Sequence, residues 1–289
     1  MKRMMMIALA FTMMLVGCSS QNSDQETTKT EPSKGTIVLG MTEWTSTKAP
    51  SAIMKALLES KGYQVEYKKA EQPVLFLGLK KQDIDFFMDA WLPYTEAPLW
   101  EKYQDDLVQV ATSYENAPLG WVVPSYVEVN SISDLNGKAD LFEGKIIGLS
   151  EGSGMTETSR EMIKDYGLNF EYVASGEATM MTEAKRKIDR NEPIIFLGWR
   201  PHSMFQKFDL KFLEDPKENF KTDNVYVISY KGIEEKHPEV YDIMSRWSIE
   251  VAELEAMMLE NEENGTPFEE LAQKWIADHP EKVNELLGQ

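Results

Sequence analysis

The chain has 289 residues, which is enough for one large domain or for two modest lobes. Hydrophobic residues make up 42% and charged residues 27%, a balance typical of a soluble globular protein. Acidic residues outnumber basic residues by 48 to 30, so the chain lacks the basic footprint that binding to nucleic acid or to anionic lipid requires.

Residues 1–17 have the composition of a secretory signal, with Lys2 and Arg3 before an apolar run too short to span a bilayer comfortably. Cys18 follows and is the only cysteine, so no internal disulfide is expected. This arrangement resembles a bacterial lipoprotein signal, which implies that Cys18 is lipidated; the alternative is a plain signal with an incidental cysteine. Residues 18–35 are polar, so we expect a flexible tether at the outer face of a membrane.

The next part of the chain alternates between predicted strands and helices. Apolar or alternating runs indicate strands, and apolar residues at helical spacing indicate helices. In chain order, we predict strands at 36–40, 63–67 and 84–90, helices at 49–60 and 74–82, and an extended segment at 119–127 that Pro124 interrupts.

A second unit of the same kind follows, and the chain then becomes helical. We predict strands at 144–150, 170–174, 193–199 and 224–232, and helices at 154–167 and 179–191. After His237-Pro238 the pattern is helical to the end, in two or three pieces that break near 265–267 and 279–280.

Strands alternating with helices predict an α/β fold with mostly parallel sheets, and the two similar units predict two lobes. The chain should cross between the lobes near 122–128 and 224–230. The first lobe is then discontinuous, with residues 36–123 and 228–289, and residues 124–227 form the second.

Ligands of such folds bind outside the carboxyl ends of the strands, and three tryptophans follow predicted strands there: Trp44, Trp91 and Trp199. A Gly-Ser-Gly turn at 152–154 follows a fourth strand and opens a helix. Indole faces around one point bind a quaternary ammonium, which cannot donate hydrogen bonds. The N–H groups at the helix start would bind an anion. Together they predict a site for a small zwitterion such as a betaine.

A single tryptophan more often packs in a core than binds a ligand, and it is the joint placement at strand ends that favours a site. Trp247 and Trp275 fall at the helical spacing of apolar residues in the predicted C-terminal helices, so we interpret them as packing residues. Trp100 has the same interpretation. Trp121 lies close to a predicted crossing and fits either role.

Four motifs carry a resemblance to a known family: "AWLP", "GLSEGSGM", "GWRPHSMF" and "FDLKFLEDPK". They resemble the substrate-binding proteins of glycine betaine and proline betaine ABC importers over about residues 36–289. The resemblance implies a periplasmic-binding-protein-like (type II) fold whose two lobes close about a hinge. It also implies delivery to a membrane permease driven by an ATPase, in osmoprotection.

The resemblance implies a role for each site residue. Trp44, Trp91 and Trp199 would form the ammonium cage. The backbone N–H groups of Gly154 and Met155 would hold the carboxylate, with Ser153 beside them at the polar end of the site. We expect a monomer that needs no metal and no cofactor.

The segment after "AWLP" departs from the family. Many betaine-binding members have a histidine there that helps hold the carboxylate, whereas this chain has Thr95 and Glu96. A glutamate would repel a carboxylate. Either Glu96 points away and Thr95 helps instead, or the ligand is a hydroxyl-bearing cation of the choline or carnitine type. We place betaine first and the choline-type ligand second.

Two other classes of function compete with a receptor. An enzyme would need a nucleophile with its base, or metal ligands, but His202, His237 and His279 have no metal-ligand spacing and no catalytic motif is present. A structural or signalling lipoprotein that docks a protein partner would show no stabilisation by a small ligand, whereas a receptor would.

Overall fold

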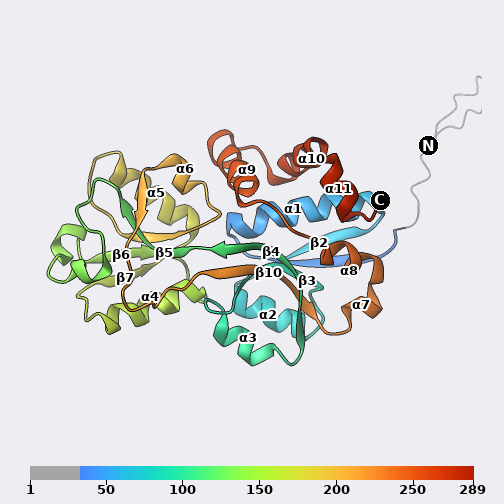
Figure 1. Ribbon diagram of the computed structural model, residues 1–289, viewed down its shortest axis with the longest axis horizontal. Coiled ribbons are helices and arrows are strands. Elements are labelled where there is room, and N and C mark those ends of the chain that lie inside the picture. The colour runs from blue at the N-terminus through green and yellow to red at the C-terminus, as the bar shows by residue number, and fades with distance from the viewer. Residues whose placement is uncertain (1–32) are drawn as a thin grey trace, which may run out of the picture. The chain divides into compact units, whose positions relative to one another are not determined.

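The computed structural model describes residues 33–289 (Figure 1). The predicted signal at 1–17, Cys18 and most of the predicted tether lie outside the described residues. Within 33–289, no helix has both the length and the apolar character that crossing a bilayer requires.

The first sheet has five strands in the order β2-β1-β3-β10-β4. Strand β1 pairs in parallel with β2 and β3, and β10 is antiparallel to its neighbours β3 and β4. The apolar run of β3 is buried at every position, as a strand covered on both faces should be. The strand bounds are β1 (Thr36–Met41), β2 (Gln64–Lys69), β3 (Phe86–Leu92), β4 (Leu107–Ala117) and β10 (Asp223–Tyr230).

The second sheet repeats this arrangement in the order β7-β6-β8-β5-β9. Strand β6 is parallel to β7 and β8, and β5 is antiparallel to β8 and β9. In each sheet the antiparallel strand is the one that arrives from the other sheet, which makes both sheets mixed rather than mostly parallel as predicted. The bounds are β5 (Leu119–Pro124), β6 (Lys145–Gly148), β7 (Glu171–Ala174), β8 (Phe196–Trp199) and β9 (Leu210–Phe212).

Helices flank both sheets, and the C-terminal run is helical as predicted (Figure 1). Gly265 caps α9 in the left-handed conformation (φ 69°), which glycine adopts without strain, and Pro280 begins α11. The α-helices are α1 (Thr45–Ser60), α2 (Gln72–Lys80), α3 (Ala97–Tyr103), α4 (Gly154–Asp165), α5 (Glu177–Ile188), α6 (Met204–Lys207), α7 (Ile233–Lys236), α8 (Pro238–Ser245), α9 (Val251–Asn264), α10 (Phe268–Asp278) and α11 (Pro280–Leu286).

We call the part built on the first sheet the first lobe and the part built on the second sheet the second lobe. By sheet membership the chain changes lobes at Pro118, between β4 and β5, and returns between Phe212 and Asp223. The predicted boundaries between the lobes, at 123/124 and 227/228, each lie a few residues after these changes of sheet. The exact limits of the lobes stay a prediction.

Three tryptophans outside the predicted cage are buried in the packed interior with their indole N–H groups satisfied. Trp121 donates to Ser159 Oγ, Trp247 to Ser113 Oγ and Trp275 to Glu253, at 2.9, 2.9 and 2.8 Å. A buried N–H without an acceptor would cost about 1–3 kcal/mol, so each bond stabilises the fold. Trp100 is partly buried against the same core. Of the two roles that the sequence left open for Trp121, the structure therefore supports packing in the core.

Candidate functional site

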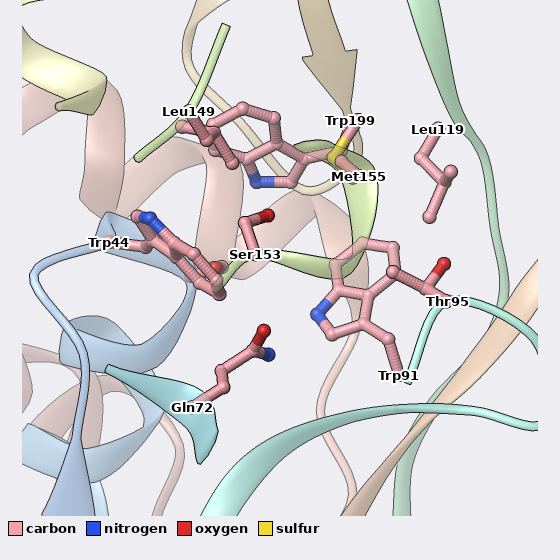
Figure 2. A pocket seen from close by; sticks show the side chains of 10 residues that line it. Trp44, Gln72, Trp91, Thr95, Leu119, Leu149, Ser153, Met155 and Trp199 are labelled. Carbon is pink, nitrogen blue, oxygen red and sulfur yellow. The ribbon is translucent and has the colours of Figure 1, made fainter. Parts of the chain in front are cut away.

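A small cavity lies where residues of both lobes meet. Figure 2 shows three indole rings facing this hollow, with Ser153 and Gln72 directed toward it. None of the lining residues is charged, so the wall offers aromatic faces and a few neutral polar groups. The lining residues are Trp44, Ser46, Gln72, Trp91, Thr95, Leu119, Leu149, Ser153, Met155 and Trp199.

The three predicted cage residues, Trp44, Trp91 and Trp199, all line the cavity, and we call them the tryptophan cage. Trp44 follows β1 and precedes α1, Trp91 lies near the end of β3, and Trp199 ends β8. Their side chains are 8%, 5% and 2% exposed. Two come from the first lobe and one from the second, so the cage is complete only when both lobes contribute.

Trp91 is held in place from behind by Asp89 and Tyr114. Its indole N–H donates to Asp89 Oδ1 at 2.8 Å, and its ring meets that of Tyr114 edge to face at 6.5 Å. Asp89 also accepts hydrogen bonds from Ser46 Oγ at 2.9 Å and Thr47 Oγ1 at 2.6 Å. Burial raises the pKa of Asp89 above its usual value, and these three donors oppose that shift by stabilising the ionised form.

Trp199 is supported by His202, whose ring meets the indole edge to face at 4.7 Å. His202 is buried; its Nδ1 accepts the backbone N–H of Met204 at 3.0 Å, and its Nε2 lies 3.2 Å from Glu177 Oε1. His202 does not line the cavity, so its place is behind the cage. This agrees with the structural role that histidines at such positions usually have.

The predicted polar end is formed by the start of α4. Ser153 and Met155 line the cavity, and Ser153 makes no side-chain capping bond. Within residues 33–289, the backbone N–H groups of Gly154 and Met155 donate to no protein acceptor. Such N–H groups at the positive end of a helix suit a carboxylate. Gly154 itself is not a lining residue: it packs against the loop of the first lobe that carries Thr95.

Thr95 and Glu96, the two residues at the departure from the family pattern, are separated by the structure. Thr95 lines both the cavity and a second, neighbouring hollow, whereas Glu96 lines only the second hollow. Both carboxylate oxygens of Glu96 are buried and have no hydrogen-bond partner among residues 33–289. Burial and the nearby charge of Asp89 raise the pKa of Glu96 well above its usual value. Glu96 is therefore not part of the cavity wall, although it is buried within reach of the charge of Asp89.

Four lining residues carry no clear signal in the sequence: Ser46, Gln72, Leu119 and Leu149. Gln72 is the most informative, because it is 2% exposed and its Oε1 has no partner among the described residues. Gln72 begins α2, next to Pro73, and many helices without a functional role begin in the same way. Only its position in space shows that Gln72 belongs to the cavity. Within 33–289 no cluster of histidine, cysteine or acidic residues could hold a metal ion.

Comparison with known proteins connects this geometry to a family. The family model of OpuAC, the substrate binding domain of ABC-type glycine betaine transport systems, matches residues 35–278. The glycine betaine/carnitine transport binding protein GbuC of Listeria monocytogenes serotype 1/2a (strain 10403S) is 34% identical over 160 residues. That match covers 53% of each chain, so it spans about half the length of this curated relative.

Solved structures agree over most of the chain. Lactococcal OpuAC, closed on glycine betaine, superposes with a TM-score of 0.83 and 30% identity, covering 88% of this chain and 99% of that one. An ABC-transporter choline binding protein in complex with choline superposes with a TM-score of 0.82 and 25% identity, covering 88% and 91%. The predicted two-lobe type II α/β fold is therefore confirmed.

The matched family consists of substrate-binding domains, and the relatives above are binding proteins, so the expectation of a protein that is not an enzyme is confirmed. The family model extends over nearly all of the described residues and includes every residue of the tryptophan cage. The chain belongs to the family of substrate-binding domains of ABC-type glycine betaine transport systems.

Proposed function

We propose that this chain is the extracytoplasmic receptor of an ABC importer and that it captures a betaine between its lobes for delivery to the permease. The observation that carries the proposal is the convergence of Trp44, Trp91 and Trp199 from both lobes on one uncharged cavity. Each indole face attracts a quaternary ammonium by about 0.5–2 kcal/mol, and more when water is excluded. A quaternary ammonium has no N–H to donate, so it needs no hydrogen-bond acceptor beside the indole faces.

Betaine is the first choice because the cavity has a place for a carboxylate. Ser153 and Met155 line the cavity from the second lobe, and the N–H groups of Gly154 and Met155 at the same helix start have no acceptor among the described residues. The objection that Glu96 would repel a carboxylate loses weight, since Glu96 lies outside the cavity lining. Thr95 lines the cavity and can add a hydroxyl donor.

A choline-type or carnitine-type ligand is the second candidate. Two acidic residues behind the cage, Asp89 and Glu177, favour this ligand, because their negative charge attracts a cation and does not stabilise a carboxylate. The relatives named above for carnitine and for choline also support it. The ligand then makes its polar contact through a hydroxyl, for which Gln72 and Thr95 supply acceptors.

The remainder of the proposed function concerns the route to the membrane. We propose cleavage after residue 17, lipidation of Cys18, a tether through residue 35 and a monomeric receptor at the outer face of the cell membrane. The support is the sequence of the N-terminal segment. The family's transport role supports delivery of the ligand to a permease, and osmoprotection is the purpose that we propose for that transport.

Calorimetry with glycine betaine, proline betaine, carnitine, choline and an uncharged isostere tests the proposal. We expect glycine betaine to bind, and the isostere to bind measurably but much more weakly, because it keeps only the apolar contacts with the indole rings. Trp91→Ala and Trp199→Ala should each lose well over 1 kcal/mol of binding, roughly a tenfold weaker affinity or more. Trp121→Ala would leave a large void in the core and so is a poor control. Trp100→Phe, at a partly buried site outside the cavity, is the better control and should keep the wild-type affinity. Binding of choline without betaine would select the second candidate, and no binding at all would reject both.

A further inference from the structure

Asp89 is a fully buried carboxylate that lies directly behind two cavity residues. Its side chain is 0% exposed, and its neighbours Trp91 and Ser46 both line the cavity while donating hydrogen bonds to it at 2.8 and 2.9 Å. Thr47 adds a third donor at 2.6 Å, to the same carboxylate oxygen as Ser46. The carboxylate is thus hydrogen-bonded directly to two residues of the cavity wall.

This carboxylate has no protein counter-charge. Among residues 33–289, no lysine, arginine or histidine forms an ion pair with Asp89. A buried carboxylate surrounded only by neutral donors is uncommon, because taking an ion out of water costs several kcal/mol and hydrogen bonds offset only part of it. The described residues thus leave a place for a positive charge that the protein itself does not supply.

The other acidic groups buried among residues 33–289 are accounted for in different ways. Asp85 faces Lys236, and Glu255 pairs with Arg200. Glu177 lies beside His202 and accepts hydrogen bonds from Thr45. Asp223 accepts the backbone N–H groups of Tyr94 and Thr95. Neither carboxylate oxygen of Glu96 has a hydrogen-bond donor among the described residues. Asp89 is the one of this group that both holds three donors and contacts the cage.

We propose that Asp89 is the buried counter-charge for the cation in the tryptophan cage, acting through Trp91 and Ser46 as a positioning residue. The inference rests on the proposed function, since it requires a cationic ligand in this cavity. Two effects follow from the geometry. The carboxylate attracts the cation across a region of low dielectric constant, and its hydrogen bond to the indole N–H makes the ring of Trp91 a better electron donor.

This role predicts a preference for charge and not merely for shape. A ligand whose quaternary nitrogen is replaced by carbon has almost the same shape but no positive charge. It gains the apolar contacts of the cage and none of the attraction to Asp89. If Asp89 only held Trp91 in position, its replacement would lower the affinity for both ligands by the same factor.

The test is calorimetry of wild type and Asp89→Asn with one cation from the panel above and its tert-butyl isostere, in which carbon replaces nitrogen. We expect Asp89→Asn to weaken the cation at least tenfold and to leave the isostere within a few-fold of its wild-type affinity. An equal loss for both ligands, or no loss for the cation, would overturn the proposal. If wild type binds neither ligand, the proposed function itself fails and this inference fails with it.

The matched control is Asp85→Asn. Asp85 is also a buried aspartate, four positions before Asp89, but it already faces Lys236 and His237 at 3.3 and 3.9 Å and lies outside the cavity. Its replacement should leave the preference for the cation unchanged. Should Asp89→Asn fail to fold, Thr47→Val removes one donor at nearly constant shape. It should lower the preference for the cation part of the way, and an unchanged preference would count against the proposal.

Discussion

Thr45 donates two hydrogen bonds to the carboxylate of Glu177, from its N–H at 3.0 Å and from its hydroxyl at 2.8 Å, across 132 residues of sequence. Thr45 begins α1, which packs on the first sheet, and Glu177 begins α5 in the second lobe. A carboxylate at the positive end of a helix of 16 residues is favourable. The pair therefore joins the lobes in the arrangement that completes the tryptophan cage.

Glu177→Gln should weaken this contact and with it the ligand affinity. Hydrogen bonds to a charged group contribute about 1.5–3 kcal/mol, so we expect roughly a tenfold or greater loss of affinity in calorimetry. The control is Glu183→Gln on the same helix, where Glu183 pairs with Arg186 at the surface and touches no residue of the first lobe. If the two variants bind ligand equally well, the contact does not support closure.

The same pair predicts a dependence on pH. Burial alone would raise the pKa of Glu177, but the hydrogen bond and charge of His202 and the two bonds from Thr45 bring it below its usual value. A carboxyl with a depressed folded-state pKa contributes stability above its unfolded value, about 4.3, and loses it as pH falls through the folded value. Thermal melts of wild type and Glu177→Gln should therefore converge in acid and separate at neutral pH. A constant difference would contradict the assignment.

Gly154→Ala should prevent the lobes from closing. A Cβ added at Gly154 would lie 2.1 Å from the backbone oxygen of Thr95, a distance that side-chain movement cannot relieve. We expect at least a tenfold loss of affinity, with small-angle scattering showing no compaction on addition of ligand. Gly176→Ala is the control, because a Cβ there meets nothing within 4 Å. Normal affinity of Gly154→Ala would mean that the close approach is not part of the bound state.

Much of the fold was predictable because the period of the hydrophobic pattern changes sharply between strands and helices. The run of β3, buried throughout, is an example. Strand β4 was missed, since it carries Gln109, Ser113, Glu115 and Asn116 and its pairing with β10 depends on a segment more than 100 residues away. Helix α3 was also missed, because it has only seven residues and contains Pro98. Local patterns do not specify such non-local pairings.

The site was predictable where one rule applied, namely that ligands lie at the carboxyl ends of strands. Trp91 and Trp199 meet this rule and line the cavity. Trp121 lies in an equally apolar strand, but Ser159 accepts its indole N–H inside the core, and no sequence pattern reveals that pairing. Gln72 was not predicted because it reaches the cavity from the start of a helix and not from the end of a strand. Its place in the site depends on how the two lobes lie together, which no local pattern specifies.

Glu96→Gln should stabilise the protein at neutral pH. The pKa of Glu96 is raised, so its contribution to stability is full below its unfolded value and is lost as pH rises. A neutral amide of the same shape removes the cost that a raised folded-state pKa imposes at neutral pH, and we expect a gain of at least about 1.4 kcal/mol, the value of one pKa unit. Denaturant unfolding at pH 7 and in acid measures it, with a smaller gain expected in acid.

The same variant also tests the position of Glu96. Because Glu96 lies outside the cavity lining, Glu96→Gln should not change the ranking of betaine and choline in calorimetry. A reversed ranking would place Glu96 in contact with the ligand. Thr95→Val is the informative comparison, since Thr95 lines the cavity and its hydroxyl should matter to the ligand's polar end.

Gln72→Leu should affect stability and binding in opposite directions. Gln72 is buried and its Oε1 has no partner among the described residues, so the ligand-free protein carries an unpaired polar atom, a cost of about 1–3 kcal/mol. Leucine removes that cost and should raise the melting temperature without ligand. If the amide serves the polar end of the ligand, affinity should fall about tenfold. Gln104→Leu, at the surface end of α3, should change neither quantity. A structural glutamine would lower stability when replaced, so only a binding residue gives the opposite signs, and a parallel loss of both would assign Gln72 to the fold alone.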